Sequence, residues 1–131
     1  MPVFSEKIYL VCEMELVMDS WGNLRVEDSM GNRQIMNIYG RKRPSNKTKW
    51  EIILDTEKMN LFLVDSFSDC NISSNQDWYV CSKTSNSTGK NITFTHYINR
   101  KNLEYKYQVD GDHWYKDDGH CKVQESVNYK F

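Results

Sequence analysis

The strongest constraint on the fold is an alternation of apolar and polar side chains with a period of two residues. It is clearest near the start of the chain, where Ile8, Leu10, Cys12, Met14, Leu16 and Met18 alternate with the mainly polar Tyr9, Glu13, Glu15 and Asp19. A strand places alternate side chains on opposite faces, so the pattern predicts a long, half-buried strand. The chain shows no convincing 3.6-residue stripe and contains no alanine, the best helix former. We therefore expect an all-β protein.

Turn-forming residues separate further alternating segments. We expect strands over about 23–29, 33–42, 49–54, 60–65, 78–84, 92–98, 103–109, 113–116 and 121–125. Between them we expect a polar loop over 66–77 that has room for a short strand around Cys70, a loop over 85–91, and turns at 110–112 and 117–120. Eight to ten short antiparallel strands at such spacing predict a compact meander, closed as a small barrel or folded as a sandwich. A chain of 131 residues has room for one such domain, which we place at 6–125.

The first residues have the features of a junction between a signal peptide and the mature chain. "PVFS" has the apolar and small residues that end a signal peptide, with cleavage before Glu6. We interpret 1–5 as a residual signal-peptide segment; the alternative is a cytosolic protein that starts at Met1. The last six residues, 126–131, are expected to form a flexible tail.

The four cysteines support export. Their number is even and their spacing is wide, at Cys12, Cys70, Cys81 and Cys121, which suits two disulfides better than a zinc site or a Cys-x-x-Cys redox pair. Three pairings are possible. The most economical joins Cys70 to Cys81 and Cys12 to Cys121, the latter tying the first strand to the last. Disulfides are typical of an exported protein, periplasmic or extracellular.

Composition excludes some partners. The net charge is −1, from 17 basic and 18 acidic residues, without the clustered positive face of a nucleic-acid-binding protein. No segment approaches the roughly 20 apolar residues of a membrane-spanning helix. The one basic run, Gly40–Pro44, is interpreted as a solvated hairpin end; the alternative is a site for a phosphate or an acidic partner.

Three segments carry a resemblance: "EKIYLVCEM" at the mature start, the hairpin "INRKNLEYKY", and the ending "GHCKVQESVNYKF". Together they resemble small exported, cysteine-containing all-β proteins of marine cyanobacteria and other bacteria. The resemblance implies a compartment and a fold, and it assigns no active-site residue.

A second similarity is architectural. Periplasmic inhibitors of C-type lysozymes are small disulfide-linked barrels that begin with a Tyr-x-Cys strand. Here "YLVC" at Tyr9–Cys12 has one residue more, and "SNSTGK" at Ser85–Lys90 differs from the inhibitory loop of that family. Lysozyme inhibition is therefore kept as an alternative by analogy.

The acidic and histidine-rich segment "VDGDHWYKDDGHC" is the candidate metal site. Its possible ligands are Asp110, Asp112, His113, Asp117 and His120. Carboxylates and imidazoles suit a divalent ion, and such a site would allow an envelope hydrolase or a metal-dependent enzyme. Asp-Gly pairs are also what tight turns require, and that interpretation is favoured. No cofactor is expected.

Aromatic residues make up 13% of the chain, more than a small core needs. Those selected as candidates for binding a ligand or partner are His96, Trp78, Tyr105, Tyr107 and Trp114. His96 lies on an apolar face, where a packed core histidine is the alternative. The sequence contains no nucleophile elbow, P-loop, dinucleotide fingerprint or metalloprotease motif. It therefore favours a non-enzymatic protein that binds another protein or a small apolar ligand. An open, aromatic-lined cavity around His96 would indicate the ligand, and a filled core with an exposed aromatic patch would indicate the protein.

Overall fold

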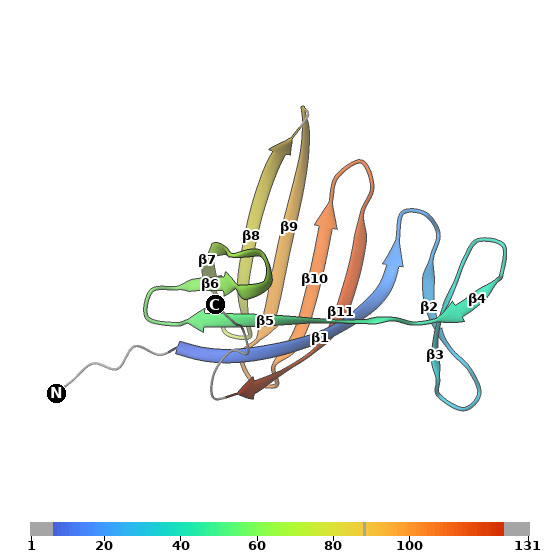
Figure 1. Ribbon diagram of the computed structural model, residues 1–131, viewed down its shortest axis with the longest axis horizontal. Coiled ribbons are helices and arrows are strands. Elements are labelled where there is room, and N and C mark those ends of the chain that lie inside the picture. Colours follow the sequence, from blue (N-terminus) through green and yellow to red (C-terminus); the bar gives the residue numbers. More distant parts are fainter. Residues whose placement is uncertain (1–6, 88, 125–131) are drawn as a thin grey trace.

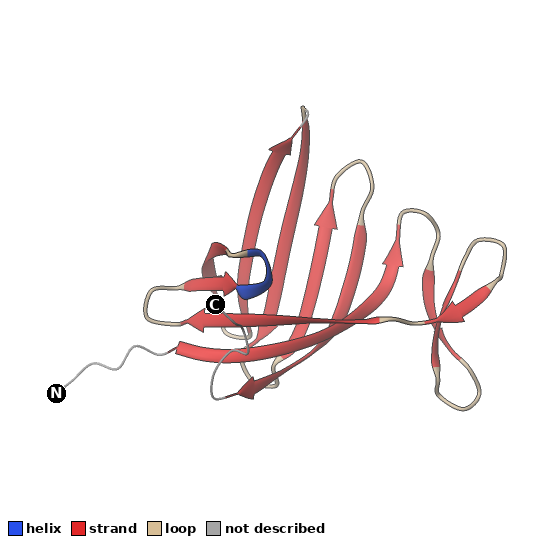
Figure 2. Ribbon diagram, viewed as in Figure 1, coloured by secondary structure: helices blue, strands red, loops and turns tan. Residues whose placement is uncertain are grey.

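The computed structural model describes residues 7–87 and 89–124, and shows an all-β protein (Figure 2). The expected segments 1–5 and 126–131 lie outside the described residues. The elements, labelled in Figure 1, are β1 (Lys7–Asp19), β2 (Leu24–Glu27), β3 (Arg33–Met36), β4 (Lys42–Pro44), β5 (Lys47–Asp55), β6 (Asn60–Leu63), the 3-10 helix η1 (Val64–Ser66), β7 (Ser68–Ser74), β8 (Trp78–Ser87), β9 (Lys90–Asn99), β10 (Glu104–Asp110) and β11 (Tyr115–Gln124). Within these ranges no helix is long and apolar enough to cross a membrane.

Eight of the strands form a closed antiparallel barrel. The hydrogen-bonded order runs β11-β10-β9-β8-β7-β6-β5-β1, and β1 also pairs with β11. This closure decides between the two predicted architectures, barrel and sandwich, in favour of the barrel. Closing the sheet removes the exposed edges that an open sheet would present.

The alternation read from the sequence gives the barrel its core. Every barrel strand contributes a buried side chain: Leu10, Cys12 and Met14 from β1, Ile52 and Leu54 from β5, Leu61 from β6, Cys70 and Ile72 from β7, Cys81 from β8, Ile98 from β9, Tyr105, Tyr107 and Val109 from β10, and Cys121 from β11. Apolar area removed from water stabilises the fold by roughly 25 cal/mol per Å².

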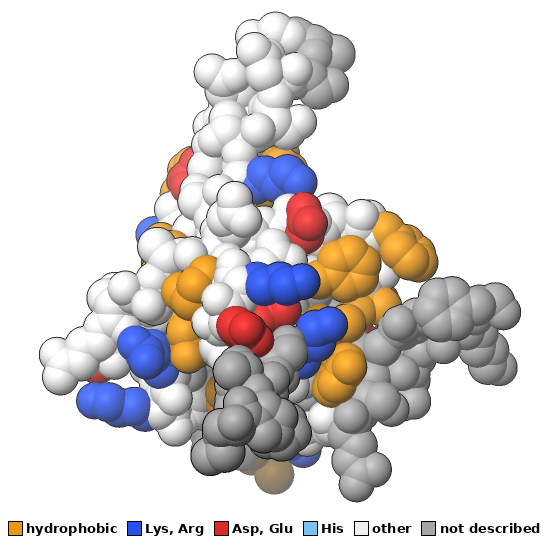
Figure 3. Space-filling view, turned by 90° about the vertical axis from the view of Figure 1, so that its left-hand side faces the viewer, with side chains coloured by type: hydrophobic (Ala, Val, Ile, Leu, Met, Phe, Trp, Pro, Cys, Tyr) orange, Lys and Arg blue, Asp and Glu red, His pale blue; other side chains and the backbone are white. Residues whose placement is uncertain are grey.

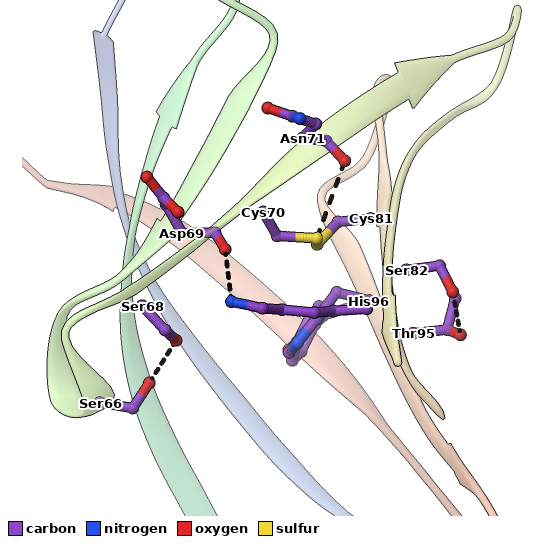
Figure 4. Close-up of a disulfide and its surroundings, with 11 residues drawn as sticks. Ser66, Ser68, Asp69, Cys70, Asn71, Cys81, Ser82, Thr95 and His96 are labelled. Carbon is purple, nitrogen blue, oxygen red and sulfur yellow. Dashed lines mark hydrogen bonds between the residues drawn. A yellow bond between two sulfur atoms is a disulfide. The ribbon is translucent and has the colours of Figure 1, made fainter. Parts of the chain in front are cut away.

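Two disulfides link neighbouring strands, and they are the more economical pairing considered from the sequence. Cys12 and Cys121 face each other in register where β1 meets β11, so this bond closes the barrel covalently. Cys70 and Cys81 join β7 to β8. Figure 4 shows the second disulfide beside His96, which is the cross-strand partner of Cys81 on β9.

The three remaining strands extend the sheet beyond the barrel. β1 pairs with β5 as far as Glu15 and then, at Met18, with Leu24 of β2, so β2, β3 and β4 continue away from the barrel (Figure 1). We call β2–β4, Leu24–Pro44, the arm. Its outer edge is β4, a short strand of Lys42, Arg43 and Pro44. Short length, positive charge and a proline all discourage pairing with another strand.

Several predicted boundaries are wrong. The segment 33–42 is two strands because Asn37 makes a tight turn, its Oδ1 accepting the backbone N–H groups of Tyr39 and Arg41, while Gly40 takes a positive φ of 78°. Most of the loop expected over 66–77 is β7, and β8 and β9 extend into the loop expected over 85–91.

The turn predicted at 117–120 is also wrong, because β11 runs through it without a break. A Cβ on Gly119 would lie 1.7 Å from the carbonyl oxygen of Glu13 on β1. This glycine therefore allows close approach of two strands, a known use of glycine inside a strand.

Candidate functional site

The candidate binding residue His96 lies inside the barrel in a packed aromatic cluster. Its Nδ1 and the hydroxyl of Tyr105 share a hydrogen bond of 2.5 Å. The ring of Trp50 lies 5.5 Å from that of His96 and 4.8 Å, edge-on, from that of Tyr107. Burial lowers the pKa of His96 to about 4, so the imidazole is neutral at pH 7. His96 and Tyr105 thus satisfy each other's hydrogen-bonding groups, and the Tyr107 ring packs against His96.

Asp117 joins this cluster from β11. Burial first, and then the charge of Asp118, raise its pKa to about 6, against an opposing effect of Arg25. The pKa of Tyr107 rises well above its ordinary value because of burial and the neighbouring Tyr115. At pH 7 the interior His96 and Tyr107 are therefore neutral, whereas Asp117 is mostly ionised.

The structure does not assemble the candidate metal site. Asp112 forms an ion pair of 2.9 Å with Lys90, and His113 stacks on Trp21 with ring centroids 4.4 Å apart. Asp110 accepts hydrogen bonds from the Gln108 amide.

Asp117 and His120 are separated by the pleat of β11. Their positions differ by three along one strand, so they point to opposite faces: Asp117 toward the interior tyrosines and His120 outward. Across residues 7–87 and 89–124, no three His, Cys, Asp or Glu side chains are placed to hold a metal ion. The continuous strand, in place of the predicted turn, is the reason.

A groove on the outer wall, which we call the charged groove, has a volume of about 570 Å³. It is lined by Val11, Glu13, Met14, Glu15, Arg25, Arg33, Lys47, Lys49, Glu104, Asp118, Gly119, His120 and Lys122. Across the strands, opposite and like charges face one another: Lys47 pairs with Glu15, and Glu15 pairs with Asp118.

The arm compensates that like-charge pair. Arg25 donates two hydrogen bonds, of 2.6 and 3.2 Å, to the Asp118 carboxylate and lies 3.7 Å from Glu15. Glu15, only 6% exposed, also accepts hydrogen bonds from Arg33 and from the Ser45 hydroxyl. Burial acts to raise the pKa of Glu15, but these hydrogen bonds and the two guanidinium charges outweigh it and hold the pKa below its usual value. We call these five residues the Glu15 network; it holds the arm against the barrel.

A second groove, the aromatic groove, has a volume of about 470 Å³. Its lining is Val17, Asn75, Trp78, Val80, Tyr97, Lys106, Tyr107, Gln108, Lys116, Asp117 and Asp118. It contains two of the candidate binding residues, Trp78 and Tyr107. Neither groove is lined by His96 or Tyr105.

Exposed apolar side chains are concentrated in the segment that contains the arm and the β1–β2 turn before it. Of the seven large hydrophobic residues exposed among the described residues, five lie between Trp21 and Tyr39. Trp21, Ile38 and Tyr39 are 57%, 67% and 80% exposed. On the face seen in Figure 3, by contrast, hydrophobic side chains are interspersed with basic and acidic ones.

Contacts bring the β1–β2 turn together with the β3–β4 turn and with the β10–β11 loop. The Ile38 side chain lies against Gly22, where a Cβ would come within 2.0 Å of the Ile38 Cγ2 atom. Gly22 also has a φ of 87°, which glycine adopts readily. Ser20 exchanges two hydrogen bonds with the backbone of Trp114, which anchors the β1–β2 turn to the β10–β11 loop. We call Trp21, Ile38, Tyr39 and His113 the end patch. The candidate Trp114 is half-buried, and its backbone is hydrogen-bonded to Ser20, next to Trp21 in the chain.

Sequence reasoning missed the end patch and the Glu15 network. Alternation places Glu13 and Glu15 on the polar face of the first strand, which predicts exposed carboxylates. No neighbouring residue in the sequence indicates that the arm packs over Glu15. The only sequence signal for the patch is the exception to alternation at "NIYG", where Ile38 and Tyr39 follow each other immediately before a glycine.

Comparison of the chain with protein-family models, with curated proteins and with solved structures found no significant match. The resemblance to exported bacterial all-β proteins therefore stays a hypothesis, and function has to be argued from this chain alone.

Proposed function

We propose that the protein is a non-enzymatic binding protein of an exported, oxidising compartment, and that it binds a protein partner through the end patch. The observation that carries the proposal is the exposure of Trp21, Ile38 and Tyr39 in the β1–β2 and β3–β4 turns, which meet where Ile38 lies against Gly22. Apolar surface exposed in this way marks interaction sites, and tryptophan and tyrosine are the residues that most often anchor them.

The interior argues against the alternative of a ligand carried within the barrel. A ligand carrier needs an open cavity in which the polar side chains of the lining are free to bind the ligand. His96 and Tyr105 are instead hydrogen-bonded to each other, and Trp50 fills the space beside them. The two disulfides favour the exported compartment, where such bonds persist.

The charge beside the patch indicates an acidic partner. Arg41 and Arg43 are exposed and lie two and four positions after Tyr39, and their side chains form no ion pair with any residue in 7–87 or 89–124. A rim of cations around an apolar centre favours a partner with a matching apolar pocket and acidic rim. The same charges would make the association rate fall as salt rises.

Site-specific photo-crosslinking tests the proposal. A benzophenone amino acid replaces Tyr39, or, as the matched control, Phe67, which is 73% exposed on a different part of the barrel. The protein is exported in its source cell and irradiated there. We expect one discrete adduct from position 39, none from 67, and loss of the adduct when Trp21→Ser and Ile38→Ser are added.

Equal adducts from both positions, or none from position 39, would contradict the proposal. An adduct with the mass of two copies of this chain would also overturn it, because the partner would then be the protein itself. Mass spectrometry of the adduct distinguishes these outcomes.

A further inference from the structure

The outer wall of the barrel carries an apolar surface that the core does not need. Alternation along β8 directs Cys81 inward and sends Trp78 and Val80 outward, where Tyr97 of β9 lies beside them. The Trp78 and Tyr97 rings meet edge to face, with centroids 6.2 Å apart and planes at 86°. All three side chains are only half-buried. They line one side of the aromatic groove, which was defined above.

The other side of the groove is cationic. The Lys106 ammonium lies 5.2 Å from the centre of the Trp78 ring. Its nearest carboxylate is that of Glu104 at 3.9 Å, at the limit of an ion pair. Lys116, an exposed residue, adds a second ammonium, 5.8 Å from the Trp114 ring.

The acidic residues of the groove do not cancel this charge. Asp118 is engaged by two hydrogen bonds from Arg25. Asp117 lies in register with the interior Tyr107, and strand alternation puts its side chain on the opposite face of β11 from that of Lys116. The amide groups of Asn75 and Gln108 complete the lining with neutral hydrogen-bonding groups.

We infer that the aromatic groove binds a small organic anion that carries a flat apolar ring. The ring packs against Trp78, Tyr97 and Val80, and the carboxylate or a similar group meets Lys106 and Lys116. The volume, about 470 Å³, lies within the range of roughly 300–1,000 Å³ that small-molecule sites occupy. Apolar walls with a few placed polar groups are the usual composition of such sites. This inference stands apart from the proposed function, because it uses a different surface.

Three probes of one shape and three charges test it: 2-naphthoate, 2-naphthalenemethanol and 2-naphthalenemethylamine. Each is titrated into the oxidised protein, and binding is followed by two-dimensional amide NMR, with the Trp78 indole signal as the local reporter. We expect saturable shifts confined to β8–β11, with 2-naphthoate binding at least tenfold more tightly than the alcohol and the amine more weakly still.

Variants separate the roles of ring and charge. Trp78→Ala should weaken all three probes, whereas Lys106→Gln should reduce the preference for the anion over the alcohol severalfold and leave binding of the alcohol nearly unchanged. The matched controls are Trp21→Ala in the end patch and Lys58→Gln in the β5–β6 turn, and neither should change any affinity. Because the Trp78 side chain faces outward, Trp78→Ala should remain folded and give an amide spectrum like that of the native protein. If Trp78→Ala does not fold, the inference is tested by Lys106→Gln alone.

Equal affinity for the anion and the amine would overturn the inference. So would shifts scattered over the whole protein, or an unchanged preference for the anion in Lys106→Gln. If Trp21→Ala no longer bound 2-naphthoate while Trp78→Ala still did, the site would lie in the end patch, and the inference would also be overturned.

Discussion

The Glu15 network makes a quantitative prediction about how the arm is held. Replacing Arg25 with alanine removes a cation that forms ion pairs with both of the cross-strand neighbours Glu15 and Asp118. Asp118 loses both hydrogen bonds from Arg25, and Glu15 keeps only Arg33 and Ser45. We expect Arg25→Ala to destabilise the protein strongly.

The magnitude follows from burial. Removing one partner of a fully buried ion pair costs about 3–5 kcal/mol. Here Glu15 is 6% exposed and Arg25 17%, but Asp118 is 31% exposed, and water can solvate it in part. Since Glu15 also retains a cation, we expect the free energy of unfolding to fall by about 2–3 kcal/mol, less than for a fully buried pair.

Urea unfolding of the oxidised protein at pH 7 measures this loss. The matched control is Arg43→Ala, which removes an exposed cation from the same face of the arm and should change stability by less than about 0.5 kcal/mol. A double-mutant cycle with Asp118→Asn should give a coupling energy of about 1–2 kcal/mol. An Arg25→Ala variant as stable as its control would refute the reasoning.

The pH dependence provides a second readout of the same variant. The folded protein holds the pKa of Glu15 below its ordinary value of 4.5, so its contribution to stability is complete above that pH. The contribution disappears as the pH falls through the folded-state pKa, because the protonated carboxyl no longer pairs with arginine. The deficit of Arg25→Ala should therefore be full at pH 7 and shrink below pH 4. A deficit that is constant from pH 7 to pH 3 would mean that it is not electrostatic.

Three further predictions concern the barrel itself. Replacing Cys12 and Cys121 with serine opens a loop of 109 residues and should cost about 5 kcal/mol in urea unfolding, against about 3 for the 11-residue loop of the other disulfide; the reverse order would contradict this. Gly119→Ala should cost more than about 3 kcal/mol or prevent folding, since β1 blocks its Cβ, whereas Gly111→Ala, with nothing closer than 3.4 Å, should be nearly neutral; similar losses would contradict the strand contact. Burial raises the pKa of Asp117 to about 6, so ionisation of this carboxyl opposes folding. Asp117→Asn should therefore be as stable as the native protein below pH 4 and become more stable by about 1–2 kcal/mol, after solvent screening, as the pH rises through about 6; equal pH profiles would contradict this.

The architecture could be predicted from the sequence where local pattern determines it. Alternation along residues 8–18 predicts a half-buried strand because the barrel buries one of its faces, and Leu10, Cys12 and Met14 are indeed buried. The same pattern fails at Asp117–His120, where Asp-Gly is equally the signature of a turn. Only the approach of β1, which no local pattern encodes, decides that Gly119 lies within a strand.

The candidate sites were predictable only in part. Trp78 and Trp114 were selected for their residue type, and the structure places one in the aromatic groove and the other beside the end patch. The contact of Arg25 with Asp118 joins residues 93 positions apart, so neither spacing nor charge pattern could indicate it. The acidic and histidine-rich segment predicted one cluster, but strand alternation and the ion pair of Asp112 with Lys90 distribute its residues to different neighbours.

The central claim, that the protein acts by binding through the end patch, is tested most directly by competition for the crosslinked complex. Purified, oxidised protein is added in excess while position 39 is irradiated with the partner present. We expect the native protein and Trp78→Ala to suppress the adduct equally, and the Trp21→Ser, Ile38→Ser double variant to leave it unchanged. Full suppression by the double variant, or failure of Trp78→Ala to compete, would contradict the claim.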